Sequence, residues 1–333
     1  MDKILSQIPE EFRDLALREK QPDWLGPMLA KLTHDEFSAK NWIFERKLDG
    51  VRCIVYKNGK DVKIYSRNRN KLNNSYPQLV EALKSQRVER FIADGEIVAF
   101  KGKLTSFSEL QKRMNIRDPD KVKGHNTPVF YYLFDLLHIE DLNLTDLPLL
   151  ERKKILKNNI DFTDPLRFTV HRNEKGLEFL EDACRKKWEG LIAKKADSKY
   201  IHTRSPNWLK FKCSNQQEFV IGGYTEPTGS RIGFGALLLG YYDQGDLIYA
   251  GKVGTGFDDA FLNELYKKMK KLEIEKPGFS NAAEIRSRNV HWIKPKIVGQ
   301  VSFTEWTRDN KLRHPSFLGL RDDKTAKDVV KEI

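Results

Sequence analysis

The chain has 333 residues, of which 39% are hydrophobic and 11% aromatic, so it can bury the core of one or two domains. It contains no apolar run near the ~20 residues of a membrane span, and residues 1–15 do not resemble a signal peptide. The 59 Lys and Arg residues outnumber the 47 Asp and Glu residues, giving a formal net charge of +12. This charge favours a polyanionic partner, nucleic acid before an anionic membrane surface.

The cysteines are few and far apart. Cys53, Cys184 and Cys213 are odd in number and form no C-x-x-C pair, so we expect no disulfide framework and a reducing, cytoplasmic location. The seven histidines are scattered, which argues against a zinc site.

The first two-thirds of the chain predicts a mixed α+β domain rich in antiparallel strands. Residues 2–20 are expected to form a short charged helix. Strand-like segments run from Trp42 to Tyr65, with Asn58-Gly59 as a hairpin turn. Helices are predicted at 76–85, 106–114 (with Ser106 as its cap) and 149–160, and strands at 91–100 (two, about a turn), 129–139, 189–195 and 208–213.

After residue 215 the chain becomes strand-rich, with turn signals between the strands and a single helix at 258–272. About five short strands and one helix fit a small all-β barrel of the OB type. We therefore predict two domains, residues 1–215 and 216–333, with the boundary near Asn215–Glu218.

Two lysines of WLKFK are expected to point the same way. Because strand residues alternate between faces, Lys210 and Lys212 share a face with Trp208. The two ammonium groups repel each other unless the face is solvated, as at a protected edge strand, or an anion lies between them.

ERKLDG at 45–50 has the same alternation, which places Glu45, Lys47 and Asp49 on one side. A lysine between two acids usually forms an ion pair, and an ordinary lysine is protonated at neutral pH. A nucleophilic Lys47 needs burial, nearby cations such as Lys210 or Arg52, or a bound metal to lower its pKa.

Carboxylates for a divalent cation occur in two further motifs. Asp94 and Glu96 lie in DGE, and Glu189 begins EGL. The aromatic run FYYLFD could stack on a base, although such a strand is more often part of a core.

KLDGVR at 47–52 resembles the K-x-D-G-x-R signature of the ATP-dependent DNA ligases, a family related to RNA ligases and mRNA capping enzymes. Further family motifs are matched in family order: SRN (66–68), FIADGEIV (91–98), YYLFDLL (131–137), EGLIAKK (189–195), RSPNWLKFK (204–212) and GLRDDK (319–324). Residues 222–240 and 303–324 resemble the ligase domain of bacterial ligase D, the non-homologous end-joining enzyme.

The resemblance implies a nucleotidyltransferase (adenylation) domain followed by an OB-fold domain, with ATP and Mg²⁺ or Mn²⁺ as cofactors. It implies that Lys47 attacks the α-phosphate of ATP, that Asp49 orients the reacting groups and that Glu45 accepts from the adenine amino group. Phe134 would stack on adenine, with Tyr132 as the alternative.

The other roles follow from the same resemblance. Glu96 would bind the ribose or a metal-bound water, and Glu189 would be the main metal-site acid. The cations would contact ribose or phosphates, with the last two reaching the pyrophosphate from the OB domain: Arg52, Arg67, Arg204, Lys210, Lys212, Arg321 and Lys324. Asp322 and Asp323 both lie in the last motif, and the sequence does not decide which matters.

The partner implied is nicked or broken double-stranded DNA, with a Ku-like end-binding protein as a possible recruiter. We expect a monomer with no membrane association, in the cytoplasm at the nucleoid. RNA ligase, capping guanylyltransferase and a non-catalytic OB-type nucleic-acid-binding protein remain the alternatives.

Overall fold

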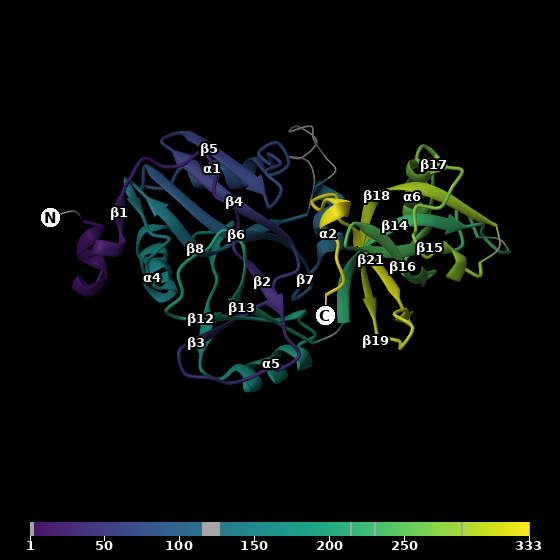
Figure 1. The fold of residues 1–333 in the computed structure, drawn as a ribbon. Helices are drawn as coiled ribbons and strands as arrows, with labels where there is room; N and C mark the ends of the chain where they lie inside the picture. Colours follow the sequence, from purple (N-terminus) through teal and green to yellow (C-terminus); the bar gives the residue numbers. More distant parts are fainter. Residues whose placement is uncertain (1–2, 115–126, 214, 230, 288, 333) are drawn as a thin grey trace. The chain divides into compact units, whose positions relative to one another are not determined.

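The computed structural model describes residues 3–114, 127–213, 215–229, 231–287 and 289–332. The chain divides into two compact units, Met1–Cys213 and Ser214–Ile333 (Figure 1). The sequence placed this division after residue 215. No helix within the described ranges is long and apolar enough to cross a membrane.

The first unit contains two sheets. Among the described residues, the larger sheet has the order β1-β9-β8-β6-β4-β5, with β10 paired to β8 and β7 to β6. Its pairs are antiparallel except for β10 and β8. The strands are β1 (Leu17–Arg18), β4 (Val51–Asn58), β5 (Asp61–Ser66), β6 (Arg90–Lys101), β7 (Leu104–Thr105), β8 (Val129–Ile139), β9 (Leu142–Asn143) and β10 (Leu166–Phe168).

The second sheet of this unit has the order β11-β3-β12-β13-β2. Its pairs are antiparallel except for β13 and β2. The strands are β2 (Leu29–Leu32), β3 (Trp42–Arg46), β11 (His171–Asn173), β12 (Gly190–Lys195) and β13 (Arg204–Lys212).

Alternation along the strands assigns neighbouring residues to different apolar clusters. On β4, Cys53 and Val55 belong to the main core, which also contains apolar side chains of the helices α1, α2 and α4. Ile54 instead belongs to a second cluster, which includes Trp208 of β13 and therefore joins the two sheets. A third cluster packs the other face of the second sheet against α5. The helices are α1 (Pro77–Lys84), α2 (Phe107–Met114), α4 (Leu149–Asn159) and α5 (Gly176–Arg185).

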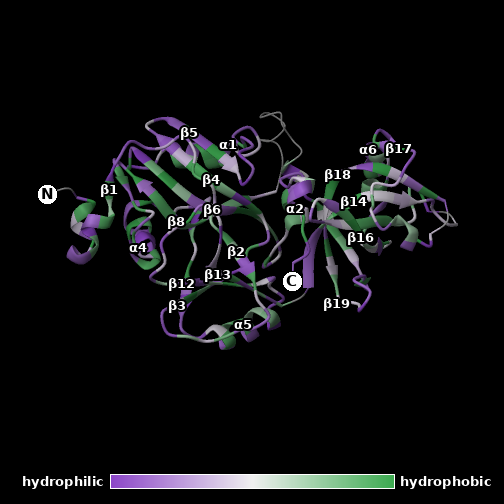
Figure 2. Cartoon of the chain, in the orientation of Figure 1, coloured by the Kyte–Doolittle hydropathy of each residue, from purple (hydrophilic) through white to green (hydrophobic). Residues whose placement is uncertain are grey.

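Most of the predicted elements in this unit are confirmed. Asn58 and Asp61 close the β4–β5 hairpin, with Gly59 in the turn at a φ of 58°. The Ser106 hydroxyl accepts a hydrogen bond from the Glu109 N–H at the start of α2. In both units, hydrophobic and hydrophilic residues alternate along the ribbon, as expected for elements with one buried face (Figure 2).

The predicted turn within residues 91–100 is wrong, because β6 runs unbroken from Arg90 to Lys101. Gly95 lies within this strand, where it allows close packing. A Cβ atom at this position would lie 2.5 Å from the Tyr132 carbonyl oxygen and 2.6 Å from the Tyr131 ring.

The predicted helix at 2–20 is also wrong. Its described part forms two 3₁₀ helices, η1 (Leu5–Gln7) and η2 (Glu10–Leu15), followed by β1. Pro9 lies between them and lacks the N–H that an α-helix would need there. Ile4 and Ile8 are buried in the main core, so this segment is packed onto the first unit.

The expectation of no disulfide is wrong as well. Cys184 of α5 and Cys213, directly after β13, are joined by a disulfide with their Cα atoms 5.1 Å apart. Their 29-residue separation gives no sequence signal, because the pairing depends on how α5 packs on the second sheet. The cysteine argument for a reducing compartment therefore no longer holds.

In the described residues of the second unit, the larger sheet is antiparallel with the order β16-β15-β14-β18-β17, β21 pairs with β18, and β19 and β20 form a separate antiparallel pair. The predicted helix is present as α6 (Asp259–Lys270), capped by Asp258, whose side chain accepts from the Phe261 N–H. A core of aromatic and aliphatic residues fills this unit. The strands are β14 (Asn215–Thr225), β15 (Leu237–Asp243), β16 (Asp246–Val253), β17 (Glu273–Ile274), β18 (Val290–Phe303), β19 (Glu305–Trp306), β20 (Leu312–Arg313) and β21 (Ser316–Leu320), with η3 (Ala282–Glu284) and η4 (Ala326–Asp328).

Candidate active site

Strands β3, β12 and β13 bring three separate sequence motifs onto one face of the second sheet. Glu45 of β3 and Lys210 of β13 lie opposite the same residue of β12, Ile192. One step along, the Lys47 N–H donates to the Gly190 carbonyl at 2.9 Å, and Gly190 lies opposite Lys212. Directly paired residues share a face, so the predicted nucleophile, adenine acceptor and phosphate cations face the same side.

Lys47 forms an ion pair with Glu189, which directly precedes β12. Both side chains are largely buried, with exposed fractions of 18% and 8%. Burial lowers the pKa of Lys47, but Glu189, Asp49 and Glu96 together raise it above its ordinary value. Lys47 is therefore held as an ammonium ion, and its partner is Glu189 rather than an acid of its own motif.

Glu45 lies in a fully buried cluster with two lysines that the sequence reasoning missed. Lys153 of α4 donates to Oε1 of Glu45 at 2.6 Å, and Nζ of Lys194 lies 2.7 Å from Oε2. Burial raises the pKa of Glu45, but the two lysines lower it below its ordinary value. The carboxylate is therefore ionised, and both of its oxygens have cationic partners.

These two lysines differ in how well the sequence could reveal them. Lys194 lies two residues after Ile192 in a predicted strand, so alternation places it on the face that carries Glu45 and Lys210. Lys153 gives no such signal, because a lysine in a charged helix normally faces water.

The Phe134 ring lies in the apolar cluster between the two sheets, next to Trp208. The guanidinium of Arg52 lies 4.4 Å from its centroid, and Nζ of Lys194 lies 4.1 Å away. Tyr132, the alternative stacking residue, instead accepts a hydrogen bond from Arg167 at 2.9 Å.

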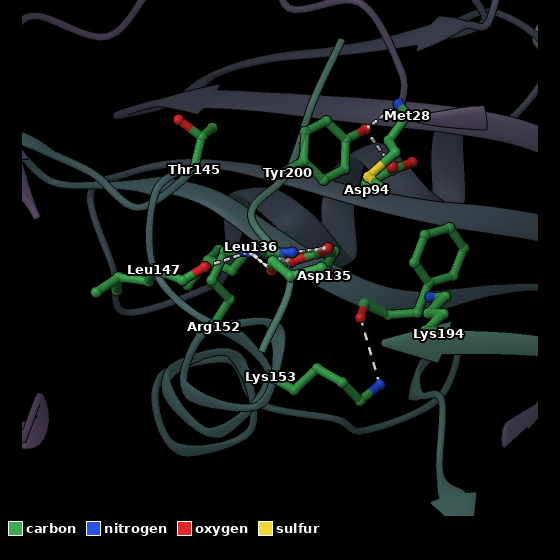
Figure 3. Close-up of polar contacts among 12 residues, drawn as sticks. Met28, Asp94, Asp135, Leu136, Thr145, Leu147, Arg152, Lys153, Lys194 and Tyr200 are labelled. Atoms are coloured by element: carbon green, nitrogen blue, oxygen red, sulfur yellow. Dashed lines mark hydrogen bonds and ion pairs between the residues drawn. The ribbon is translucent and has the colours of Figure 1, made fainter. Parts of the chain in front are cut away.

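Arg52 is part of a polar network on the first sheet. Its guanidinium makes two hydrogen bonds to Asp94, at 2.6 and 2.5 Å. The Tyr200 hydroxyl donates to the same carboxylate at 2.6 Å and accepts from the Met28 N–H (Figure 3). Asp94 is fully buried, so this network holds Arg52 in place and leaves its side chain 22% exposed.

Asp49 contacts the start of α2. Its carboxylate accepts from the Phe107 N–H at 3.1 Å, and its own N–H donates to the Thr105 hydroxyl at 3.1 Å. These bonds tie the K-x-D-G turn to the helix N-terminus, where a negative charge is favourable.

The remaining predicted residues of the first unit lie on both sheets. Glu96 of β6 lies opposite Arg52 of β4, and its charge contributes to the raised pKa of Lys47. Arg67 directly follows β5. Arg204, at the start of β13, is exposed and donates to the Ala30 carbonyl at 2.7 Å.

The last motif forms its own polar cluster within the second unit. Arg321 makes two hydrogen bonds of 2.8 Å to Asp323, and Lys324 lies 3.2 Å from Glu218 of β14. Asp323 is buried with an exposed fraction of 7%, and burial raises its pKa while Arg321 and Lys324 lower it to below the ordinary value.

The neighbouring Asp322 has a different environment. It is exposed, and its carboxylate accepts from Lys268 of α6 at 3.1 Å. The contact that fixes the motif arginine is therefore made by Asp323.

Glu189 and Glu96 offer oxygen ligands, which suit Mg²⁺. Among the residues that the structure describes, no group of three or more His, Cys, Asp or Glu side chains could hold a metal ion alone. Two carboxylates still fit Mg²⁺, because this ion commonly takes one or two protein carboxylates together with substrate phosphates.

The fold and the lysine-centred site define a nucleotidyltransferase domain followed by an OB-fold domain. Residues 27–212 match the family model of the ATP dependent DNA ligase domain, and residues 230–324 match the ATP dependent DNA ligase C terminal region. The chain belongs to the ATP-dependent DNA ligase family, and is similar to the ligase modules of ligase D proteins.

Two relatives illustrate this similarity. The multifunctional non-homologous end joining protein LigD of Pseudomonas aeruginosa is 35% identical over 319 residues, covering 93% of this chain and 37% of the relative. A DNA ligase of Thermococcus fumicolans is 33% identical over 304 residues, covering 86% of this chain and 53% of the relative. The chain thus spans between about a third and a half of these relatives' length.

Solved structures agree with this assignment. A mycobacterial DNA ligase D complexed with ATP and MES is 32% identical, with a TM-score of 0.67, over 94% of this chain and 100% of that chain. The ligase domain of Mycobacterium tuberculosis LigD gives the same identity and coverage with a TM-score of 0.51.

Proposed function

We propose that this chain is an ATP-dependent DNA ligase that seals 5′-phosphate and 3′-hydroxyl ends through a lysyl-AMP intermediate. The observation that carries the proposal is the shared face of β3, β12 and β13, where Lys47 lies with Glu45, Lys210 and Lys212. Phosphoryl transfer depends on positioning and charge neutralisation, and this face offers both.

In the first step, the lone pair of Lys47 Nζ attacks the α-phosphorus of ATP. The Lys47 ammonium first gives one proton to water, which frees this lone pair. A nitrogen–phosphorus bond then forms as the bond to the bridging oxygen breaks, pyrophosphate leaves and Nζ releases a second proton to water. An oxygen of the DNA 5′-phosphate then attacks the AMP phosphorus, which breaks the nitrogen–phosphorus bond and returns Lys47 to its amine. The 3′-hydroxyl attacks the phosphorus of the adenylated 5′-phosphate, releases its proton to water and expels AMP.

Glu189 controls when Lys47 can attack. In this structure Lys47 donates to Glu189 and its pKa is raised, so Nζ has no free lone pair. Lys47 therefore has to leave this ion pair before the first step. Lys210 and Lys212 then stabilise the negative charge on the α-phosphate.

Glu189 and Glu96 are the residues that would hold Mg²⁺ or Mn²⁺ beside the ATP phosphates. The bound cation supplies positive charge that neutralises the phosphates and these carboxylates. Neutralising Glu189 removes the main contribution that raises the pKa of Lys47.

Recognition of ATP falls to both sheets. Glu45 accepts from the adenine amino group and Phe134 stacks on the ring, a role favoured for Phe134 because Tyr132 is engaged by Arg167. The ribose and phosphate contacts fall to four side chains: Arg52, Arg67, Glu96 and Arg204. Asp49 supports the turn that carries Lys47.

The second unit contributes the pyrophosphate contacts. Arg321 and Lys324 bind the leaving group, and Asp323 orients Arg321. Asp322 has no direct part, because it is engaged with Lys268 at the surface.

Nicked or broken double-stranded DNA is the proposed partner, and the formal net charge of +12 suits it. The similarity to end-joining LigD proteins favours DNA repair by end joining, with recruitment by a Ku-like protein. We propose a monomer acting in the cytoplasm at the nucleoid.

The test is transfer of label from α-labelled ATP to the protein in the presence of Mg²⁺. We expect label on the wild type and none on Lys47→Ala or Lys47→Arg, whereas Lys63→Arg, at an exposed lysine of β5, keeps it. Circular dichroism of each variant checks that it is folded.

Substrate preference then separates the ligase from its relatives. We expect sealing of nicked DNA over nicked RNA. Label from GTP alone would favour capping chemistry, and no label from ATP or GTP would refute both enzyme functions.

A further inference from the structure

Lys153 and Lys194 place two cations on one buried carboxylate. All three side chains of this cluster are at most 3% exposed, and the lysines contact different oxygens of Glu45. A single ammonium would balance the charge, and burying a second one carries a large desolvation cost. The surplus cation therefore calls for an explanation beyond stability.

Lys153 also links the two walls of the site. Its Nζ donates to Glu45 on the second sheet at 2.6 Å and to the Phe134 carbonyl on the first sheet at 3.3 Å. A third bond, to the Thr169 carbonyl at 3.0 Å, completes its donors. One side chain from α4 thus fixes the position of Glu45 relative to Phe134.

Lys194 makes a second link between the same two residues. Its Nζ lies 2.7 Å from Glu45 and 4.1 Å from each of the ring centroids of Phe134 and Trp208. A cation at this distance from an aromatic ring is attracted to its face. Both lysines therefore hold together the carboxylate and the ring that would read and stack a purine.

The ionisation state of Glu45 decides which purine it can read. A buried carboxylate without cations tends to become protonated, and the protonated acid can donate as well as accept. An ionised carboxylate only accepts. It can take a hydrogen bond from the amino group at position 6 of adenine, but it repels the carbonyl oxygen at that position in hypoxanthine or guanine.

We propose that Lys153 and Lys194 are positioning residues that determine nucleotide specificity, keeping Glu45 ionised and at a fixed distance from Phe134. They make the site selective for purines with an amino group at position 6. This inference rests on the proposed function, since it assigns to Glu45 and Phe134 the reading and stacking of adenine.

A neighbouring pair shows what a purely structural contact looks like. Arg152 and Asp135 are both fully buried and make two hydrogen bonds of 2.7 and 2.9 Å, one cation to one carboxylate (Figure 3). Lys57 is a second reference, because it is 2% exposed and donates to the Val88 and Glu89 carbonyls, away from Glu45.

The test compares label transfer from α-labelled ATP and α-labelled inosine triphosphate, which carries a carbonyl in place of the amino group. The variants are Lys153→Met, Lys194→Met, Lys153→Arg and Glu45→Gln. Lys57→Met is the matched control, since it removes an equally buried lysine that does not contact Glu45.

For the wild type we expect a preference for ATP on the order of 10³-fold or more, since sites built on buried hydrogen bonds discriminate strongly. Lys153→Met and Lys194→Met should each reduce the ATP to inosine triphosphate ratio by about tenfold or more, toward that of Glu45→Gln. Lys153→Arg should restore part of the ratio, and Lys57→Met should keep it.

Wild-type ratios in folded Lys153→Met and Lys194→Met would overturn the inference and leave the proposed function intact. A Lys57→Met variant that loses the ratio to the same degree would also overturn it, because the effect would then follow from stability. No label on the wild type from either nucleotide would refute the proposed function and this inference together.

Discussion

Substitution of Gly190 by alanine should disrupt the site without altering a charged group. Gly190 has a φ of +144°, and a Cβ atom there would lie 1.9 Å from the Phe211 carbonyl oxygen and 2.9 Å from the Lys212 Cα. Relieving the first contact requires a shift of about 1.5 Å to reach van der Waals distance. Because Gly190 lies between the Lys47 N–H and Lys212, the shift separates the predicted nucleophile from a phosphate cation.

The size of the effect follows from this shift. A misplacement of about 1 Å commonly costs about 10²-fold in rate, so we expect Gly190→Ala to label at least about 10²-fold more slowly than the wild type. Strain and overpacking should together lower the free energy of unfolding by about 2–6 kcal/mol. Label transfer from α-labelled ATP and urea unfolding measure the two quantities.

Gly102→Ala is the matched control for this variant. Gly102 also has a positive φ, +62°, but a Cβ atom there meets nothing within 4 Å. Gly102→Ala should lower the free energy of unfolding by about 1–2 kcal/mol, the cost of a left-handed backbone for alanine, and keep the wild-type labelling rate. A Gly190→Ala protein that labels at the wild-type rate would refute the positional argument.

Three further outcomes are expected. Burial lowers the pKa of Lys194 from 10.5 to about 8, so between pH 8 and 10.5 the unfolded state binds more protons than the folded state. The free energy of unfolding of the wild type should therefore rise with pH across this range, relative to that of Lys194→Met. The expected rise is on the order of 3 kcal/mol, measured by urea unfolding. A difference that stays flat from pH 8 to 10 would contradict this pKa. Asp323→Ala should slow label transfer about tenfold or more by freeing the motif arginine, whereas Asp322→Ala should not; equal rates would show that the buried contact has no catalytic consequence. Adding a thiol reductant, which breaks the disulfide between Cys184 and Cys213, should lower the free energy of unfolding of the wild type by about 3 kcal/mol. The control is Cys184→Ser, which cannot form this disulfide and whose free energy of unfolding must not change with the reductant.

Strand alternation predicted which motif residues share a face. It predicted that Glu45 and Lys47 share a face in one motif and that Lys210 and Lys212 share a face in another. The register of β3, β12 and β13 brings these two pairs together. The sequence could not show that register, because it depends on which strands are neighbours.

Long-range pairing explains what the sequence reasoning missed. Lys47 and Glu189 are 142 residues apart, and Lys153 and Glu45 are 108 apart, so nothing in the local pattern links them. The predicted nucleophile was expected to need nearby cations. In the structure the charged groups that act on Lys47 are acids, and Arg52 forms an ion pair with Asp94.

Strand β6 was misread for a related reason. Residues 91–100 were predicted to contain a turn, yet Gly95 lies within an unbroken strand where only a hydrogen atom fits against Tyr132. The requirement comes from the neighbouring strand β8 and not from the chain itself.

The most direct test of the account is to map the AMP-bearing residue. The protein is incubated with ATP and Mg²⁺, digested under alkaline conditions that preserve a phosphoramidate, and its peptides are sequenced by mass spectrometry. We expect AMP on Lys47. AMP on Lys194, whose pKa of about 8 makes it the more readily deprotonated amine, would contradict it.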